Sequence, residues 1–372
     1  MPGPGACVPS GLDQWARVRS LGRLRGKRIG PSSSTSANID REVEVTLLLS
    51  ASDVQKALSM KDAIELVERG FVEFGAGGVD MPQRPVIFVP QNDGLAAFMP
   101  AFVRGMGALS IKTVTAFKNN PKKGMPTIFG TVTLLDPETG VPLSIMDGGY
   151  LTAVRTGAAS GVATKYLARK DARVAAIFGA GVQGRTQLEA ICTVRDIEEV
   201  RVVDKDQQAA ERFVEEMSGR SPIPVTVKVV ATPKDALEGA DIVATATTSP
   251  SPIFDGDDLS PGVHINGVGS HAPKARELDT RTVVRSKIVC DSVAACLVEA
   301  GDLLIPIEEG ALNRSDIHGS LAEVIGGQLP GRQSNEEITL FKSVGLAFQD
   351  AATALETYRK ARAMGLGTEF RF

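Results

Sequence analysis

The chain has 372 residues, of which 43% are apolar and 23% charged, and its formal net charge is −3. These values are ordinary for a globular protein of about two domains. A weakly acidic chain with one Trp and three Tyr offers neither the basic surface nor the aromatic platform of a nucleic-acid-binding protein. No apolar run reaches the ~18 residues that a membrane helix needs. We therefore expect a cytoplasmic protein with a small-molecule partner, without nucleic acid or membrane.

Residues 1–40 differ from the rest of the chain, because they are rich in Arg and Ser and nearly free of acids. This composition is typical of an organelle transit peptide, but also of a flexible extension or of a start codon assigned too far upstream. The sequence leaves these alternatives open, and the segment is excluded from the prediction of the fold. We describe it as a flexible, basic, Ser-rich extension.

Neither the cysteines nor the histidines form a metal-binding or redox pattern. The four cysteines contain no CxxC pair, and the three histidines contain no HExxH pattern. Three cysteines lie in apolar segments, where a thiol usually serves as a small core side chain. We predict core thiols, no disulfide and no metal site; the cysteines are Cys7, Cys192, Cys290 and Cys296.

Residues 41–150 predict a substrate-binding and dimerisation domain that contains both helices and strands. Two short helices follow the potential N-cap residues Ser50 and Ser59. Five β-rich runs come next, separated by turn signals such as "QNDG" and "DPETG". Consecutive short strands of this kind favour an antiparallel or mixed sheet, or a partial barrel.

Residues 151–324 predict a Rossmann domain, because strand-like and helix-like segments alternate there. Residues 336–365 predict one long helix, within a segment 325–372 that we expect to complete the first domain. The predicted fold class is therefore α/β. It combines a Rossmann-type doubly wound parallel sheet with an α+β domain built from N- and C-terminal segments.

The stretch "VAAIFGAGVQGRTQLEAI" contains a GxGxxG pattern in the setting that dinucleotide binding requires. Glycine is so common here, with 38 in 372 residues, that roughly 0.4 accidental matches are expected. In this case an apolar run of strand length precedes Gly179, Gly181 and Gly184, and a helix pattern follows. The three glycines allow a tight turn, a close approach to pyrophosphate, and close packing of helix on strand. The pattern predicts a phosphate-binding turn at a helix N-terminus.

A second strand, "EVRVVD", ends in Asp204, twenty residues beyond Gly184. A carboxylate at this spacing accepts hydrogen bonds from the ribose hydroxyls of NAD. The same carboxylate would repel the 2′-phosphate of NADP, although the adjacent Lys205 could soften that preference. We therefore predict NAD as the cofactor.

Four motifs in the same order resemble the ornithine cyclodeaminase/mu-crystallin family, and especially its archaeal-type alanine dehydrogenases. They are "DPETGVPLSIMDGGYLTAVRTGAASGVATKYLARK", "FGAGVQG", "HINGVGSHAPKARELD" and "EEITLFKSVGLAFQDAA". The resemblance extends from about Leu47 to the C-terminus. It implies a homodimer in which a substrate domain packs against a Rossmann domain. It also implies transfer of a hydride between NAD(P) and the α-carbon of an amino or imino acid.

The resemblance also implies roles for individual residues. Arg84, Lys112 and Arg155 correspond to three cations around the substrate carboxylate, and Lys112 corresponds to the catalytic lysine that exchanges a proton. Such cations form charge-assisted hydrogen bonds with a carboxylate, and a lysine with a lowered pKa can act as acid or base. The expected cofactor-binding residues are Gly179, Gly181, Val182, Gln183, Gly184, Asp204, Thr247, Ser249, Gly267, Val268, Gly269, Ser343 and Gly345.

Two positions depart from the ornithine cyclodeaminases, which use an aspartate and a glutamate for the distal amine. Ser249 stands at the expected place of the aspartate, and Ala97 at that of the glutamate. We therefore favour an NAD-dependent oxidoreductase that acts on the C–N bond of a small L-amino acid or cyclic imino acid, of the alanine dehydrogenase or ketimine reductase type. An ornithine cyclodeaminase, which makes proline and ammonia with bound NAD, is the alternative. A non-enzymatic, mu-crystallin-like ligand-binding protein is the third possibility.

Overall fold

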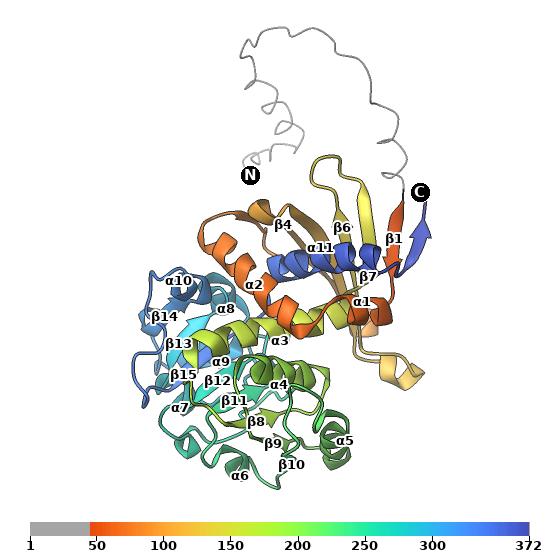
Figure 1. Cartoon of the computed structure of the whole chain (residues 1–372). Coiled ribbons are helices and arrows are strands. Elements are labelled where there is room, and N and C mark those ends of the chain that lie inside the picture. The colour runs from red at the N-terminus through yellow and green to blue at the C-terminus, as the bar shows by residue number, and fades with distance from the viewer. Residues whose placement is uncertain (1–44, 372) are drawn as a thin grey trace, which may run out of the picture. The chain divides into compact units, whose positions relative to one another are not determined.

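The computed structural model describes residues 45–371, which form two sheets flanked by helices (Figure 1). The basic extension predicted for residues 1–40 lies outside the described residues, as does Cys7. Within the described part, each sheet has eight strands. None of the helices in residues 45–371 is both long and apolar enough to cross a membrane.

The first sheet is mixed, which is one of the alternatives that the consecutive short strands left open. Its order is β16-β1-β7-β6-β5-β4-β2, with β3 paired to β4. The pair of β1 and β7 is parallel, and the other pairs are antiparallel. The strands are β1 (Thr46–Leu49), β2 (Val79–Asp80), β3 (Val86–Val89), β4 (Gly94–Val103), β5 (Ala108–Phe117), β6 (Ile128–Leu135), β7 (Pro142–Asp147) and β16 (Thr368–Phe370).

Helices α1 (Ala51–Ala57), α2 (Met60–Gly75) and α11 (Ala347–Ala363) belong to the same part of the molecule (Figure 1). Ser50 and Ser59 cap the first two helices by accepting backbone hydrogen bonds, as predicted. Helix α11 packs on β4 and β5 and also contacts α2. The buried side chains of these elements form one apolar core.

The second sheet is entirely parallel and doubly wound, which confirms the predicted fold class. Its order is β10-β9-β8-β11-β12-β15-β13-β14. The chain runs outward from β8 to β10 and then returns to β11 on the other side of β8. The strands are β8 (Val174–Phe178), β9 (Glu199–Val203), β10 (Val227–Val229), β11 (Ile242–Thr245), β12 (His264–Gly267), β13 (Lys287–Cys290), β14 (Ile317–Ser320) and β15 (Thr339–Lys342).

Helix α3 (Gly148–Leu167) joins the two parts, because it contacts strands of both sheets. A Cβ at Gly157 would come within 2.5 Å of the Thr186 carbonyl oxygen, and a Cβ at Gly161 within 2.8 Å of Ile64. The small residues of α3 thus let it lie close to α2 and α4 at once. The remaining helices are α4 (Val182–Val194), α5 (Gln207–Met217), α6 (Pro233–Leu237), α7 (Thr280–Val284), α8 (Val293–Glu299), α9 (Gly301–Glu308) and α10 (Leu321–Ile325).

Two predictions about the C-terminal segment were wrong. Residues 336–365 are not one helix, because β15 lies at their start and α11 begins only at Ala347. Strand β15 pairs with β12 and β13, so part of the segment 325–372 belongs to the Rossmann sheet rather than to the first domain. All four residues of β15 are buried. A short run that is buried on both faces shows no alternation, so periodicity cannot separate it from a helix.

The cysteines of the described region have the predicted environment. Cys192, Cys290 and Cys296 are buried free thiols. Each lies in one of the two apolar cores of the Rossmann part. We assign them a packing role.

Candidate active site

The glycine turn has the backbone geometry that a dinucleotide requires. Gly179 directly follows β8 with φ +103°, a conformation that side chains with a Cβ rarely adopt. A Cβ at Gly184 would collide with the carbonyl oxygen of Gly179, so α4 can lie this close to β8 only with glycine there. A Cβ at Gly181 would have no atom within 4 Å, and no side chain caps α4 at this residue. The space beside Gly181, at the start of the helix, is therefore open.

Asp204 lies directly beyond β9 and beside this turn. Its Oδ2 accepts a hydrogen bond of 2.7 Å from the Ala180 backbone N–H, and its Oδ1 accepts one of 2.9 Å from Asp206. Each carboxylate oxygen has a further lone pair that can accept a bond from a ribose hydroxyl. The turn and Asp204 together fit NAD, at the topological switch point between β8 and β11.

The other predicted cofactor residues lie at the same edge of the sheet. They follow β11 (Thr247, Ser249), end or follow β12 (Gly267, Val268, Gly269), begin α4 (Val182, Gln183) or follow β15 (Ser343, Gly345). Since all strands are parallel, these positions share the carboxyl edge of the sheet. The structure thus brings together segments that are far apart in the sequence.

A buried carboxylate that sequence reasoning missed holds two of these loops. Glu277 accepts hydrogen bonds from the backbone N–H groups of Thr247 at 2.6 Å and Gly269 at 2.8 Å, and from the Thr245 hydroxyl at 2.9 Å. Burial raises the pKa of Glu277, while the nearby Lys342 acts in the opposite direction. Glu277 thereby fixes the spacing between the ends of β11 and β12.

A second missed carboxylate shapes the turn after β15. Asp291 Oδ2 accepts bonds from the Ser343 hydroxyl at 2.8 Å, and from the backbone N–H groups of Val344 at 2.9 Å and Gly345 at 2.8 Å. Asp291 directly follows the apolar strand β13, where an acid is unusual enough to have been a signal. This turn links the cofactor edge of the sheet to the cluster of cations described next.

The three cations predicted from the resemblance do lie close together. Lys112 on β5 and Arg155 on α3 share one carboxylate, Asp350 on α11. Lys112 Nζ is 2.7 Å from Asp350 Oδ2, and Arg155 Nε is 3.0 Å from Asp350 Oδ1. Gln349 accepts a further hydrogen bond of 2.8 Å from Arg155. Sequence reasoning missed Asp350 and Gln349, although a polar pair amid the small residues of "AFQDAA" was a usable signal.

Arg84 reaches the same place from the loop between β2 and β3. It donates hydrogen bonds to the carbonyl oxygens of Val344 at 3.3 Å and Gly345 at 3.2 Å. It also forms an ion pair of 2.8 Å with Glu299, at the end of α8. A Cβ built on Gly345 would lie 2.7 Å from Arg155 Nη1, so the glycine separates the two guanidinium groups.

The environment of Lys112 favours proton exchange near neutral pH. The side chain is only 1% exposed. Burial lowers the pKa of Lys112, the charge of Arg155 lowers it further, and Asp350 opposes both, with a net result of about 8. A lysine with a pKa in this range can both hold and release a proton under ordinary conditions.

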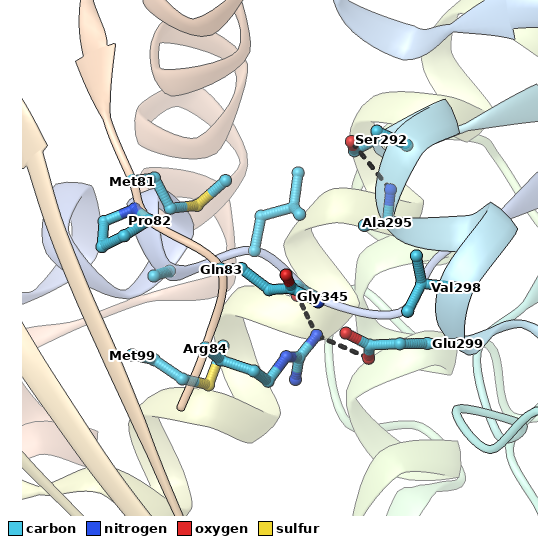
Figure 2. A pocket seen from close by; sticks show the side chains of 13 residues that line it. Met81, Pro82, Gln83, Arg84, Met99, Ser292, Ala295, Val298, Glu299 and Gly345 are labelled. Atoms are coloured by element: carbon cyan, nitrogen blue, oxygen red, sulfur yellow. Dashed lines mark hydrogen bonds and ion pairs between the residues drawn. The ribbon is translucent and has the colours of Figure 1, made fainter. Parts of the chain in front are cut away.

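A pocket of about 310 Å³ lies beside the cations, between the first sheet and helix α8. Figure 2 shows Met81 and Met99 on one side of it, Val298 and Glu299 on the other, and Arg84 extending toward Glu299. Met99 is the register partner of Lys112 across β4 and β5. Apolar side chains dominate the lining; its residues are Met81, Pro82, Gln83, Arg84, Met99, Ser292, Ala294, Ala295, Val298, Glu299, Gly345, Leu346 and Ala347.

The two positions that depart from the cyclodeaminases carry no acid that could bind an amine. Ala97 lies on β4 and is buried. The Ser249 hydroxyl donates a hydrogen bond of 2.7 Å to the Ser251 carbonyl oxygen. The acid that the tertiary structure places in the pocket is Glu299, which already pairs with Arg84.

Several known proteins are similar to this chain over most of its length. The model of the ornithine cyclodeaminase/mu-crystallin family matches residues 44–365. A Δ1-pyrroline-2-carboxylate reductase of Bacillus cereus is 39% identical over 327 residues, which cover 88% of this chain and all of the relative.

Two solved structures have the same fold over nearly their whole length. The Δ1-pyrroline-2-carboxylate reductase of Thermococcus litoralis, in complex with NADH and L-proline, is 48% identical with a TM-score of 0.84. The match covers 87% of this chain and 99% of that one. An archaeal alanine dehydrogenase dimer with bound NAD is 36% identical with a TM-score of 0.82, over 88% and 99% of the two chains.

Proposed function

Because the chain belongs to the ornithine cyclodeaminase/mu-crystallin family, we propose that it reduces a cyclic imino acid of the Δ1-pyrroline-2-carboxylate class with NADH. The predicted enzyme class, an NAD-dependent oxidoreductase of amino or imino acids, is confirmed by the relatives, and so is NAD as the cofactor. The product of the proposed reaction is the corresponding cyclic amino acid.

The observation that carries this proposal is an apolar pocket beside a cluster of cations. A cyclic imino acid has one carboxylate and a compact apolar ring. Arg84 and Arg155 supply charge for the carboxylate, and Met81, Met99, Val298 and Leu346 supply an apolar surface for the ring. An amino acid with a distal ammonium group would meet the same apolar surface, and the acid in the lining, Glu299, already pairs with Arg84.

We assign the protonated Lys112 the role of proton donor to the imine nitrogen. When bound, NADH supplies the hydride for the α-carbon. Arg84 and Arg155 hold the carboxylate and thereby orient the C–N bond. Asp350 holds Lys112 and Arg155 in fixed positions, since it pairs with both. Arginine stays protonated, so it binds and orients but does not transfer the proton.

A spectrophotometric assay tests the reaction directly. We expect NADH absorbance to fall when the protein is mixed with Δ1-pyrroline-2-carboxylate, and to fall more slowly with pyruvate and ammonium. Faster oxidation of NADH with pyruvate and ammonium would instead indicate an alanine dehydrogenase. Ammonia and proline formed from ornithine, without net change in NADH, would indicate a cyclodeaminase and contradict the proposal.

The cofactor preference has its own test at Asp204. We expect NADH to bind at least about tenfold, or ~1.4 kcal/mol, more tightly than NADPH, because the carboxylate repels the 2′-phosphate. The variant Asp204→Ser should narrow this gap. Fluorescence titration with both cofactors measures it, and tighter binding of NADPH to the wild type would refute the assignment.

We also propose that the protein is a homodimer that associates through the outer face of the first sheet. Side chains alternate between the faces of a strand, and Lys112 points toward α11, so its neighbour Ile111 points outward. Phe129 and Ile87 lie on the same outer face by register, through Thr115 and Ala96. Ile87 is 58%, Phe129 50% and Ile111 38% exposed, which leaves an apolar face in contact with solvent.

The dimer proposal is supported by the archaeal alanine dehydrogenase, which forms a dimer. We expect the wild type to elute as a dimer in size-exclusion chromatography and the double variant Ile111→Asp/Phe129→Asp to elute as a monomer. A variant with Val225→Asp is the matched control, because Val225 is an exposed apolar residue outside this sheet. A dimer that survives the double substitution would place the interface elsewhere.

A further inference from the structure

We propose that Glu299 restricts the site to substrates with a single carboxylate. Glu299 occupies one side of the Arg84 guanidinium and neutralises its charge, so imino acids with a second, side-chain carboxylate are rejected. This inference rests on the proposed function, since it concerns the specificity of the same pocket.

Glu299 bridges the two parts of the molecule across the pocket. Its Oε2 is 2.8 Å from Arg84 Nη2, and the two side chains are 22% and 23% exposed. Figure 2 shows Arg84 extending from the strand side of the pocket toward Glu299, which projects from α8. The other partners of Arg84 are the carbonyl oxygens of Val344 and Gly345, which add no negative charge. Glu299 is therefore the carboxylate that balances Arg84.

The charges around the pocket leave room for one anion. In the ion pairs of the site, three cations, Arg84, Lys112 and Arg155, face two carboxylates, Asp350 and Glu299. These five side chains together carry one net positive charge, and the nearby Asp291, which acts on Glu299, is negative as well. A substrate with one carboxylate offsets the positive charge of the five, whereas a substrate with two adds an excess negative charge to a partly desolvated site.

The remainder of the pocket offers no compensation for a second carboxylate. Met81, Met99, Val298 and Leu346 are apolar, and Gln83 is neutral. Burial raises the pKa of Glu299, Arg84 lowers it, and the negative charge of the nearby buried Asp291 raises it further. A second carboxylate near α8 would thus approach two acidic side chains, and like charges brought together disfavour binding.

The experiment compares two substrates with the NADH-loaded protein. Δ1-pyrroline-2-carboxylate carries one carboxylate, and oxaloacetate with ammonium supplies an imino acid with two. The variant Glu299→Gln removes the charge and keeps the shape, whereas Glu299→Asp keeps the charge. Glu308→Gln is the matched control, because it removes a charge at the exposed end of α9. Thermal melting of each variant checks that it is folded.

For the wild type, we expect kcat/KM to be much higher with the one-carboxylate substrate than with the two-carboxylate substrate. The ratio of these two values measures the specificity. Glu299→Gln should lower this ratio by at least about tenfold, mainly through the two-carboxylate substrate, since one unfavourable charge contact is removed. Glu299→Asp and Glu308→Gln should leave the ratio within about threefold of the wild type.

The outcomes separate the two proposals. If the wild type reduces Δ1-pyrroline-2-carboxylate but the ratio is unchanged in Glu299→Gln, the role of Glu299 is refuted while the proposed function stands. If the wild type reduces neither substrate, the proposed function fails. The role of Glu299 is then judged from calorimetric binding of pyrrole-2-carboxylate against pyrrole-2,5-dicarboxylate, where the same change of ratio is required. If Glu299→Gln abolishes formation of ammonia from ornithine, Glu299 binds an ammonium group and this inference is wrong.

Discussion

Two buried lysines in this protein form ion pairs of the same length but have opposite pKa shifts. Lys112 Nζ lies 2.7 Å from Asp350, and Lys342 Nζ lies 2.7 Å from Asp302. Both lysines and both aspartates are at most 1% exposed. Burial lowers the pKa of each lysine, yet the pKa of Lys112 falls to about 8 while that of Lys342 rises.

The two pKa shifts differ because the charges around each lysine differ beyond its aspartate partner. Asp350 is shared between Lys112 and Arg155, so one carboxylate faces two cations, and Arg155 also repels Lys112. Lys342 instead lies near two carboxylates, Asp302 and Glu277, and both favour its charged form. It also donates a hydrogen bond of 2.8 Å to the Ser270 carbonyl oxygen. One lysine can release a proton near neutral pH, and the other is a permanent cation.

This comparison shows how a fold separates a chemical role from a structural one. A buried lysine–aspartate pair alone says nothing of function, because the same pair occurs in both places. The number of cations that compete for the carboxylate decides whether the lysine titrates in the useful range. Lys112 also borders the apolar pocket through Met99, whereas Lys342 lies inside the Rossmann sheet.

The largest expected effect concerns the proton donor. In Lys112→Met we expect turnover to fall by ~10²–10⁴, the usual loss for an acid–base group. Substrate binding should weaken by ~1.5–3 kcal/mol, because one charge-assisted bond is lost. NADH affinity should stay close to that of the wild type, since the glycine turn lies in the other sheet. Steady-state kinetics and NADH titration measure these effects.

The variant Arg155→Ala distinguishes substrate binding from proton transfer. It should weaken substrate binding more than turnover, because arginine does not exchange protons. A Lys112→Met protein that kept more than about a tenth of the wild-type turnover would leave Lys112 as a carboxylate anchor only.

The next effect is on stability and concerns the other lysine. In Lys342→Met, Asp302 and Glu277 lose their cation in the interior, and we expect the free energy of unfolding to fall by ~3–5 kcal/mol. Asp302→Asn should destabilise to a similar extent, because it leaves Lys342 unpaired and weakens the bonds from the Glu277 and Leu278 backbone N–H groups. Urea unfolding followed by circular dichroism measures both. A loss of less than about 1 kcal/mol would show that this pair is not a structural element.

The smallest effect is a shift in pH dependence. Imine reduction requires the protonated Lys112, so kcat/KM should fall as pH rises through its pKa, about 8 in the wild type. Asp350 favours the protonated form, and therefore Asp350→Asn should move this decline to lower pH, by about one unit or more.

Two variants serve as controls for the pH profile. Asp350→Glu keeps the charge and should largely restore the profile, which distinguishes positioning of Lys112 from a general loss of structure. Asp302→Asn should leave the midpoint of the decline unchanged, because Asp302 pairs with the other lysine. If the midpoint of the decline in kcat/KM does not move in Asp350→Asn, Lys112 is not the group whose titration causes the decline.

Much of the fold was predictable because its signals are local. The N-caps Ser50 and Ser59, the alternation of strands and helices, and the turn from Gly179 to Gly184 each depend on residues close together in the chain. Residues 336–365 were predicted wrongly because the signal that makes part of them a strand is not local. Strand β15 is a short apolar run whose strand character comes from its neighbours β12 and β13.

The site was predictable only in part. The resemblance pointed to Arg84, Lys112 and Arg155, and the structure places all three around the Gly345 turn and the pocket. It could not point to Asp350, which lies 195 residues from Arg155, or to Glu299, which approaches Arg84 from the other part of the molecule. Contacts between distant segments follow from packing, and a single sequence contains no periodic signal for them.

The sequence by itself thus determined the Rossmann turn, the carboxylate Asp204 and the family, because spacing along one chain is sufficient for each. Only the tertiary structure decided which carboxylate each cation meets. That packing brings Arg155 to Asp350 beside Lys112, and it brings the carboxylates of Asp302 and Glu277 to Lys342. Because a charge in a buried site responds to every neighbour within a few ångströms, the chemistry of Lys112 is a property of the packed protein rather than of the residue.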